Sequence, residues 1–304
     1  MNLSLKSLLF GLTVGDALGV PVEFYSRDSL KQHPVKSMQG YGTHNQPPGT
    51  WSDDSSLSFC LAEAINEKFS IELLAKKFVA WYHHAYWTAH DDVFDIGIST
   101  QMAFENLVLG INPINAGGKT ENSNGNGSLM RISPLVYYIK DMPINQRFEL
   151  TKQVSSITHG HIRSILACFY FLEFLRELLI TSDKKSAYFN TQKIINEYLI
   201  TIELSQNELQ NFDKLLKNDI GSYQENKIES SGYVVHTIEA SMWCLMTTKN
   251  YKEAVLNAVN LGGDTDTTAS VTGAMAGLLY GYESIPSEWI NLLAKKENIE
   301  KLCC

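Results

Sequence analysis

The chain has 304 residues, enough for one large domain or two ordinary ones, and its 44% hydrophobic content is sufficient for a sizeable core. A formal net charge of −8 argues against nonspecific nucleic-acid binding, which depends on a basic surface. The five cysteines lack C-x-x-C spacing, which disfavours a zinc site or redox pair and indicates reduced thiols.

Residues 1–22 are largely apolar but contain Lys6, Gly11 and Asp16. We expect Asp16 to interrupt this stretch before it reaches a membrane-spanning length, so the sequence predicts neither a signal peptide nor a transmembrane helix. We therefore predict a cytoplasmic protein that does not bind membranes.

The periodicity along the chain is overwhelmingly helical. Apolar residues at i, i+3, i+4 and i+7 spacing predict helices over residues 57–65, 162–170, 234–245 and 271–279. Strand-like alternation is scarce. Residues 34–49 read as a long ordered loop, a class of segment that is often functional. Residues 181–230 are more polar and predict surface helices and loops. We predict an all-α fold with residues 1–304 in a single domain.

The predicted helix over residues 271–279 and the positions just before it are rich in small residues. A helix of this kind can be approached closely by its neighbours, so we place it at the centre of the bundle. Its N-terminus would then be buried, with Asp264, Asp266 and Thr267 at the start of the helix. The small residues are Ala269, Ser270, Gly273, Ala274, Ala276 and Gly277.

Two acidic clusters lie more than two hundred residues apart, each where a loop runs into a helical pattern. They are residues 51–55 (Trp-Ser-Asp-Asp-Ser) and residues 262–268 (Gly-Gly-Asp-Thr-Asp-Thr-Thr). Helix capping would explain either cluster alone, but capping needs only one side chain per helix. Folded together, the clusters would bring four carboxylates into one cavity, where their repulsion demands countercharge. Two divalent cations would supply it, and oxygen ligands of this type suit Mg²⁺ or Mn²⁺.

Residues 124–131 (Asn-Gly-Asn-Gly-Ser-Leu-Met-Arg) form a second candidate feature. The two glycines would let the backbone approach a ligand, and the apolar run that follows suggests a helix whose N–H groups face that ligand. A short Asn/Gly loop is by itself usually a turn. Arg131 could add positive charge to such a site or form a buried salt bridge.

Four single residues each allow a functional and an ordinary interpretation. His159 could stack on a base, contact a phosphate or simply cap a helix, and Tyr233 could stack on an adenine or merely pack. Asp95 could bind a ligand or cap locally. Glu23 could be a fifth carboxylate near the metals or an exposed surface acid.

Five motifs occur in the order seen in the ADP-ribosylglycohydrolase family, which this chain resembles over about residues 8–281. The closest resemblance is to the bacterial branch typified by the dinitrogenase reductase activating glycohydrolase. The motifs lie at residues 15–19 (Gly-Asp-Ala-Leu-Gly), 51–55, 124–131, 158–159 (Thr-His) and 262–267.

This resemblance implies a compact, orthogonal multi-helix domain with two Mg²⁺ (or Mn²⁺) ions in a central cleft. The implied metal ligands are Ser52, Asp53, Asp54, Asp264, Asp266 and Thr267. The implied substrate contacts are Asn126, Gly127, Ser128 and Met130 at the diphosphate and distal ribose, and His159 and Tyr233 at the ADP. Glu23 and Asp95 are the implied catalytic acids.

The activity implied is hydrolysis of the bond between ADP-ribose and an acceptor, above all an arginine guanidinium on a protein, with ADP-ribose as product. Either Glu23 or Asp95 would handle the proton. Two alternatives stay open: a non-catalytic reader of ADP-ribose or a nucleotide, and a blocker of an ADP-ribosyltransferase. We expect a monomer.

Overall fold

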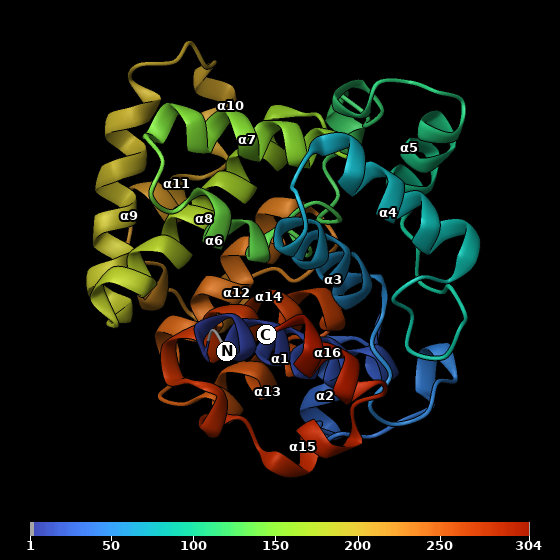
Figure 1. The fold of residues 1–304 in the computed structure, drawn as a ribbon. Coiled ribbons are helices and arrows are strands. Elements are labelled where there is room, and N and C mark those ends of the chain that lie inside the picture. Colours follow the sequence, from blue (N-terminus) through green and yellow to red (C-terminus); the bar gives the residue numbers. More distant parts are fainter. Residues whose placement is uncertain (1–2, 304) are drawn as a thin grey trace.

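The computed structural model describes residues 3–303 and confirms the all-α prediction (Figure 1). No strand occurs in this range, which holds only three isolated β-bridges. The helices are α1 (Leu3–Gly19), α2 (Arg27–Gln32), α3 (Asp53–Asn66), α4 (Ile71–His84), α5 (Ile98–Val108), α6 (Val136–Ile139), α7 (Ile144–Ser156), α8 (Ile162–Thr181), α9 (Lys184–Leu199), α10 (Gln206–Gln210), α11 (Asp213–Leu216), α12 (Val234–Thr247), α13 (Tyr251–Asn260), α14 (Thr265–Tyr280), α15 (Ser287–Leu292) and α16 (Lys296–Leu302). Short 3₁₀ turns join several of them, including Val20–Val22, Gly42–His44 and Ser133–Leu135.

Helices α1 and α14 form the centre of the fold and pack with their backbones in contact. A Cβ atom added to Gly11 would lie 2.3 Å from the carbonyl oxygen of Gly273, and one added to Gly15 would lie 2.1 Å from that of Ala269. These contacts run in opposite order along the two helices, so the helices are antiparallel. The prediction that the helix rich in small residues occupies the centre is confirmed.

The first helical segment is longer and more apolar than the sequence analysis allowed. Residues 4–22 reach membrane-spanning length with a mean hydropathy of 1.4, so the expectation that Asp16 would interrupt the stretch too early is wrong. The same window is 94% buried inside the protein, as expected for a core helix. Asp16 is tolerated there because its carboxylate accepts hydrogen bonds from Ser52 and Ser55.

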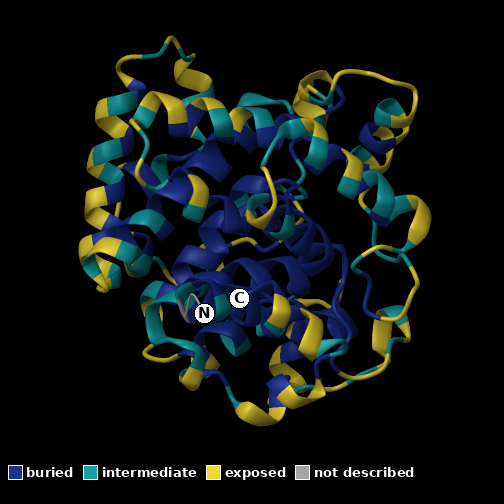
Figure 2. Ribbon diagram, in the orientation of Figure 1, coloured by how far each residue is buried: buried dark blue, intermediate teal, exposed yellow. Residues whose placement is uncertain are grey.

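The predicted apolar stripes fall within α3, α8, α12 and α14, and α14 ends just before Gly281, as expected. One hydrophobic cluster runs from α1 through these helices to α16. The buried helices lie in the middle of the view, whereas α9 and the outer side of α5 carry much of the exposed surface (Figure 2). The polar residues 181–230 form α9 to α11 and short turns, in agreement with the prediction. Cys60, Cys168 and Cys244 are buried free thiols, and Cys303 is buried as well.

Candidate metal centre

Both acidic motifs form helix N-termini, but capping does not use all of their carboxylates. Ser52 is the N-cap of α3, and its hydroxyl accepts a hydrogen bond from the amide of Asp54 at 3.2 Å. Asp53 and Asp54 follow in the first turn of α3. Asp264 occupies the N-cap position of α14 without a side-chain capping bond. Several acids therefore remain available for another role.

The two motifs meet in the folded chain. The hydroxyl of Thr267 donates to Oδ2 of Asp54 at 3.2 Å. The carboxylates of Glu23, Asp264 and Asp266 each bring an oxygen within 4.8 Å of the others. The convergence predicted from sequence is confirmed, and Glu23 belongs to the cluster.

Three buried carboxylate oxygens in this cluster have no hydrogen-bond partner among the described residues: Oδ1 of Asp54, Oδ1 of Asp264 and Oδ2 of Asp266. Burying a charged oxygen without a partner is costly. A divalent cation would compensate all three, and an all-oxygen donor set suits Mg²⁺ or Mn²⁺. The residues present therefore fit the metal pair that the family resemblance implies.

The electrostatics of the cluster lead to the same conclusion. Burial, followed by repulsion from neighbouring carboxylates, raises the pKa of Asp53, Asp54 and Asp266 well above the ordinary value. For Asp54 the strongest of these neighbours are Asp16 and Asp264. The protein alone thus lacks the positive charge that would keep these acids ionised.

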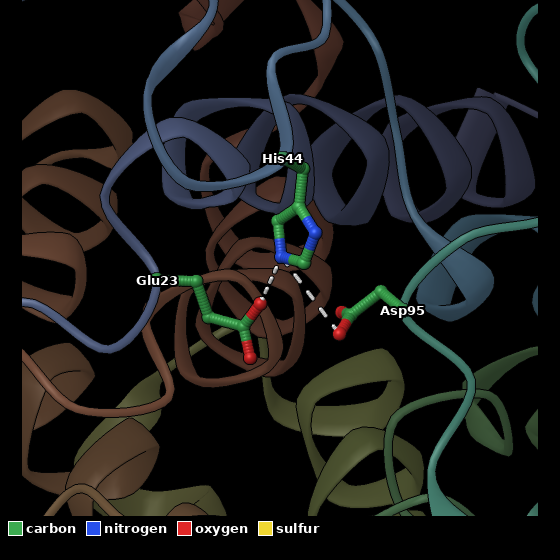
Figure 3. Close-up of side chains that lie close together, drawn as sticks. All are labelled: Glu23, His44 and Asp95. Carbon is green, nitrogen blue, oxygen red and sulfur yellow. Dashed lines mark hydrogen bonds and ion pairs between the residues drawn. The ribbon is translucent and has the colours of Figure 1, made fainter.

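Beside the cluster, His44 lies between the two carboxylates expected to move a proton (Figure 3). Its Nε2 atom is 2.5 Å from Oε2 of Glu23 and 3.8 Å from Oδ1 of Asp95. Burial and the charge of Asp264 raise the pKa of Glu23 to about 8, and burial and the charge of Glu23 raise that of Asp95 to about 7. Glu23 is thus a buried acid near the acidic cluster and not an exposed surface acid, which was the alternative interpretation.

His44 is a residue of the site that the sequence did not predict. It lies at the end of the 3₁₀ turn Gly42–His44, within residues 34–49, for which the sequence predicts a long ordered loop of a class that is often functional. The length of the loop at residues 34–49 was therefore the signal in the sequence that could have led to His44.

Asp16 is a second residue whose role was not foreseen. Its fully buried carboxylate accepts from the backbone amides of Ser52, at 3.0 Å, and Ser55, at 3.1 Å, and from the Ser55 hydroxyl at 2.5 Å. These hydrogen bonds to Asp16 connect the start of α3 to the central helix α1. They thereby fix the position of Asp53 and Asp54, which lie in the first turn of α3.

The Asn/Gly loop touches the acidic cluster through Asn126. Its side-chain amide donates to Oδ2 of Asp264 at 2.8 Å and to the hydroxyl of Thr237 at 2.9 Å. The adjacent Gly127 leaves room for His159, because a Cβ at this position would lie 2.9 Å from Cε1 of the imidazole. Arg131 donates a hydrogen bond to the carbonyl of Gly127 and so helps to fix the conformation of this loop.

Arg131 is fully buried and forms no ion pair with any residue in the range 3–303, which excludes the salt-bridge interpretation there. Its guanidinium lies 4.9 Å from the centre of the Phe78 ring. Burial lowers the pKa of Arg131 to about 10.

Two predicted substrate contacts have their side chains in the interior. Ser128 is fully buried, 3.4 Å from the sulfur of Cys168, and accepts from the hydroxyl of Ser155 at 3.0 Å. Met130 belongs to the hydrophobic core. A ligand at this loop would meet Asn126 and the main chain rather than these two side chains.

His159 and Tyr233 both lie close to the same loop. His159 is buried, its Nδ1 atom is 2.8 Å from the Thr158 hydroxyl, and burial followed by the charge of Arg131 lowers its pKa to about 3. The imidazole that caps α8 is that of His161. Tyr233, at the start of α12, is half-buried and pairs with Gly125 in an isolated β-bridge.

Two surface cavities lie apart from this centre. One of about 640 Å³ is lined by residues that include Glu63, Trp87 and Lys301, and one of about 720 Å³ lies against α9 to α11. None of the clustered acids lines either cavity.

Fold and site together define an all-helical protein with a buried carboxylate centre suited to divalent cations. The sequence profile of the ADP-ribosylglycohydrolase family matches residues 4–303, and the chain belongs to this family. It is 34% identical to the ADP-ribosylarginine hydrolase Tri1 of Serratia proteamaculans over 98% of this chain and 77% of that protein. It is 25% identical to the ADP-ribosyl-[dinitrogen reductase] glycohydrolase of Rhodospirillum rubrum over 94% of this chain and 88% of that protein.

A similar solved structure supports the same assignment. It is described as an ADP-ribosylglycohydrolase-related protein complex and superposes with a TM-score of 0.81 at 29% identity, covering 99% of this chain and 96% of that one. The predicted family and fold class are thus confirmed.

Proposed function

We propose that this protein is a divalent-metal-dependent hydrolase that removes ADP-ribose from modified arginine on proteins. The observation that supports the proposal most is the meeting of the two acidic motifs, which leaves buried oxygens of Asp54, Asp264 and Asp266 without partners. Relatives named as ADP-ribosylarginine hydrolases support the same bond and acceptor.

The residues that would hold two Mg²⁺ or Mn²⁺ ions are those of the two motifs. When bound, such ions polarise oxygen groups and lower the pKa of water. The ligands we propose are Ser52, Asp53, Asp54, Asp264, Asp266 and Thr267.

The remaining groups of the centre suit the cleavage of a glycosidic bond. Water adds to the anomeric carbon of the ribose while the bond from that carbon to the guanidinium nitrogen breaks, and the ribose gains oxocarbenium character. A buried set of carboxylates stabilises that positive charge. In the metal-free protein the pKa of Glu23 is about 8, and bound cations would lower it, so that Glu23 could exchange a proton with the reacting groups. Asp95 is the second candidate for this role.

The geometry around Glu23 and Asp95 also suits a guanidinium acceptor. Two carboxylates flank the Nε2 atom of His44, and a pair of carboxylates of this kind is what a planar cation recognises. We place the ADP portion along the Asn126–Gly127 loop, with His159 and Tyr233 beside it.

The direct test is the release of ADP-ribose from an arginine-modified protein in the presence of Mg²⁺ or Mn²⁺. Serine-linked ADP-ribose and ADP-ribosylated nucleic acid serve as comparison acceptors. Release from the arginine-linked substrate alone would support the proposal, and no release from any substrate with metal bound would refute it. Tight binding of ADP-ribose without turnover would instead favour a non-catalytic reader.

A further inference from the structure

Glu23, His44 and Asp95 form a cluster that the proposed pair of Mg²⁺ or Mn²⁺ ions does not use as ligands. One ligand atom from each residue lies within 4.8 Å of those of the other two. The three side chains come from separate segments of the chain and point toward one another (Figure 3). We call this cluster the His44 site.

The donor atoms of the His44 site differ from those of the acidic centre in a way that affects the choice of ion. The acidic centre offers oxygen atoms, which suit Mg²⁺ or Mn²⁺, whereas the His44 site adds an imidazole nitrogen. An imidazole together with carboxylate oxygens is a typical donor set for Zn²⁺ and related transition metals, and a poor one for Mg²⁺. The two places should therefore select different ions.

The ligands of the His44 site are held in place and are also accessible from solvent. The Thr43 hydroxyl donates to the main-chain carbonyl of Glu23 at 2.7 Å and so connects the turn that carries His44 to Glu23. The ring of Phe94, next to Asp95, lies 5.3 Å from the imidazole. The side chains of His44 and Asp95 keep 16% and 19% of their surface exposed. An ion can reach them without passing through the buried acidic centre.

A buried neighbour provides separate evidence that positive charge is missing here. Asp266 is fully buried, brings a carboxylate oxygen within 4.8 Å of Glu23, and contacts the side chain of Asp95. Its Oδ2 atom has no hydrogen-bond partner among residues 3–303. Burying an unpartnered carboxylate oxygen is costly, so a cation at the His44 site would stabilise Asp266 as well as its own ligands.

Binding an ion at the His44 site requires a small movement of side chains. Ligand atoms about 2.1 Å from a tetrahedral Zn²⁺ ion lie about 3.4 Å from one another. Nε2 of His44 is 3.8 Å from Oδ1 of Asp95, which is already close to this spacing. Oε2 of Glu23 would have to move away from Nε2 of His44, from 2.5 Å to about 3.4 Å, as the ion replaces their hydrogen bond.

We propose that Glu23, His44 and Asp95 bind an additional, inhibitory metal ion of the Zn²⁺ type. The bound ion occupies the carboxylates of Glu23 and Asp95, the two groups that would exchange a proton and recognise the acceptor guanidinium. Hydrolysis therefore stops while the acidic centre stays loaded with its own ions. The inhibition rests on the proposed function, whereas binding of the ion does not depend on it.

The test measures Zn²⁺ binding and hydrolysis separately, both in excess Mg²⁺. Equilibrium dialysis gives the number of Zn²⁺ ions bound per chain, and Co²⁺, whose visible absorption depends on its ligands, reports on nitrogen ligation. His44→Ala removes the nitrogen ligand, and Asp54→Asn weakens the acidic centre but keeps all three ligands of the His44 site. His33→Ala is the matched control, because His33 is an exposed histidine that follows α2. Far-UV circular dichroism checks that each variant is folded.

The wild type should bind one Zn²⁺ ion per chain in excess Mg²⁺. Its hydrolysis of an arginine-ADP-ribosylated protein should fall, and further Mg²⁺ should not restore it. His44→Ala should weaken Zn²⁺ binding by at least about tenfold and lose the Co²⁺ signal of nitrogen ligation, whereas Asp54→Asn and His33→Ala should retain both.

Retained Zn²⁺ binding in His44→Ala would overturn the proposal. Loss of Zn²⁺ binding in a folded Asp54→Asn protein would also overturn it, because the ion would then occupy the acidic centre. Zn²⁺ binding through His44 without a fall in hydrolysis would overturn the inhibitory role. A wild type that binds Zn²⁺ through His44 but releases no ADP-ribose under any condition would refute the proposed function and leave the metal site standing.

Discussion

The hydroxyl of Thr267 donates a hydrogen bond to the carboxylate of Asp54 at 3.2 Å, across 213 positions of sequence. This contact joins the N-termini of α3 and α14 and brings the two acidic motifs into one centre. Three carboxylate oxygens of that centre have no partner within the described chain. The site therefore carries uncompensated negative charge that bound cations would balance.

Asp266→Asn removes one negative charge from the middle of the cluster without changing the size of the side chain. We expect hydrolysis to fall by more than about a hundredfold, because the cluster loses both a ligand and a charge. The helical circular dichroism spectrum should be unchanged. Activity near wild type would contradict the dimetal proposal. If the variant instead protects a partner from an ADP-ribosyltransferase without turnover, the blocking role would gain support.

The metal-free protein should lose stability as the pH rises. Asp16 and Asp95 have pKa values of about 7 and Glu23 has a pKa of about 8, all above their ordinary values. Between the ordinary and the raised values the folded state therefore binds more protons than the unfolded chain. The stabilising contribution of these protonated acids is complete below about pH 4 and is lost as the pH passes about 8. The Tm measured with a chelator should therefore fall from about pH 5 to about pH 8, and added Mg²⁺ should restore it most at the higher pH.

Glu23→Gln is the control for this pH dependence, since it is neutral at every pH. The fall in Tm should be shallower for this variant than for the wild type. An equally steep fall would mean that other groups cause the effect.

His44→Ala should lower activity by about tenfold, because it removes the imidazole nitrogen that lies between the two candidate proton-transfer groups. His44→Gln keeps a donor and should recover part of the loss. A kinetic comparison at fixed metal concentration checks this. Equal losses in both variants would show that the imidazole has a role beyond hydrogen bonding.

Asn126→Asp should be more harmful than Asn126→Ala. The native amide donates to Asp264 at 2.8 Å, so an aspartate there would set two carboxylates against each other. We expect weaker binding of Mg²⁺ by titration calorimetry in both variants, with the larger loss at Asp. Tighter cation binding by the aspartate variant would indicate that position 126 can itself become a ligand.

Gly15→Ala tests the packing of α1 against α14. The added carbon would lie 2.1 Å from the carbonyl oxygen of Ala269, so the helices must separate, at a cost of about 3 kcal/mol or more in the free energy of unfolding. Gly97→Ala is the control, because its nearest atom would be the Thr100 hydroxyl at 4.0 Å, and it should cost about 1 kcal/mol or less. Urea titration measures both.

The sequence predicted those parts of the molecule that depend on periodicity and on paired motifs. The stripes in α3, α8, α12 and α14 follow from the helical repeat, and the small residues of α14 follow from close packing. The meeting of Asp54 with Thr267 was predictable because a double cluster of acids exceeds what capping requires.

The contacts that depend on the path of a loop were not predictable. His44 reaches Glu23 because the chain turns sharply at Tyr41 and Asn45, two residues with positive φ, and no periodic pattern signals this. Asp16 belongs to the motif at residues 15–19 and interrupts an apolar helix, but its role could not be predicted, since its partners at Ser52 and Ser55 come from a distant segment. The interior positions of the Ser128 and Met130 side chains likewise follow from packing around the Asn/Gly loop.

Gly19, at the end of α1, has a consequence for ion choice. A Cβ atom here would lie 2.3 Å from the Cα of Asp266, and the Gly19 carbonyl accepts from the Thr265 hydroxyl at 2.8 Å. The main chain that carries Asp266 thus rests directly on another main chain, with no flexible side chain between them to absorb a shift. Mg²⁺ requires a stricter ligand geometry than larger ions do. The ability of this centre to distinguish ions by radius would therefore depend on how rigidly the main chains at Gly19 and Asp266 pack against each other.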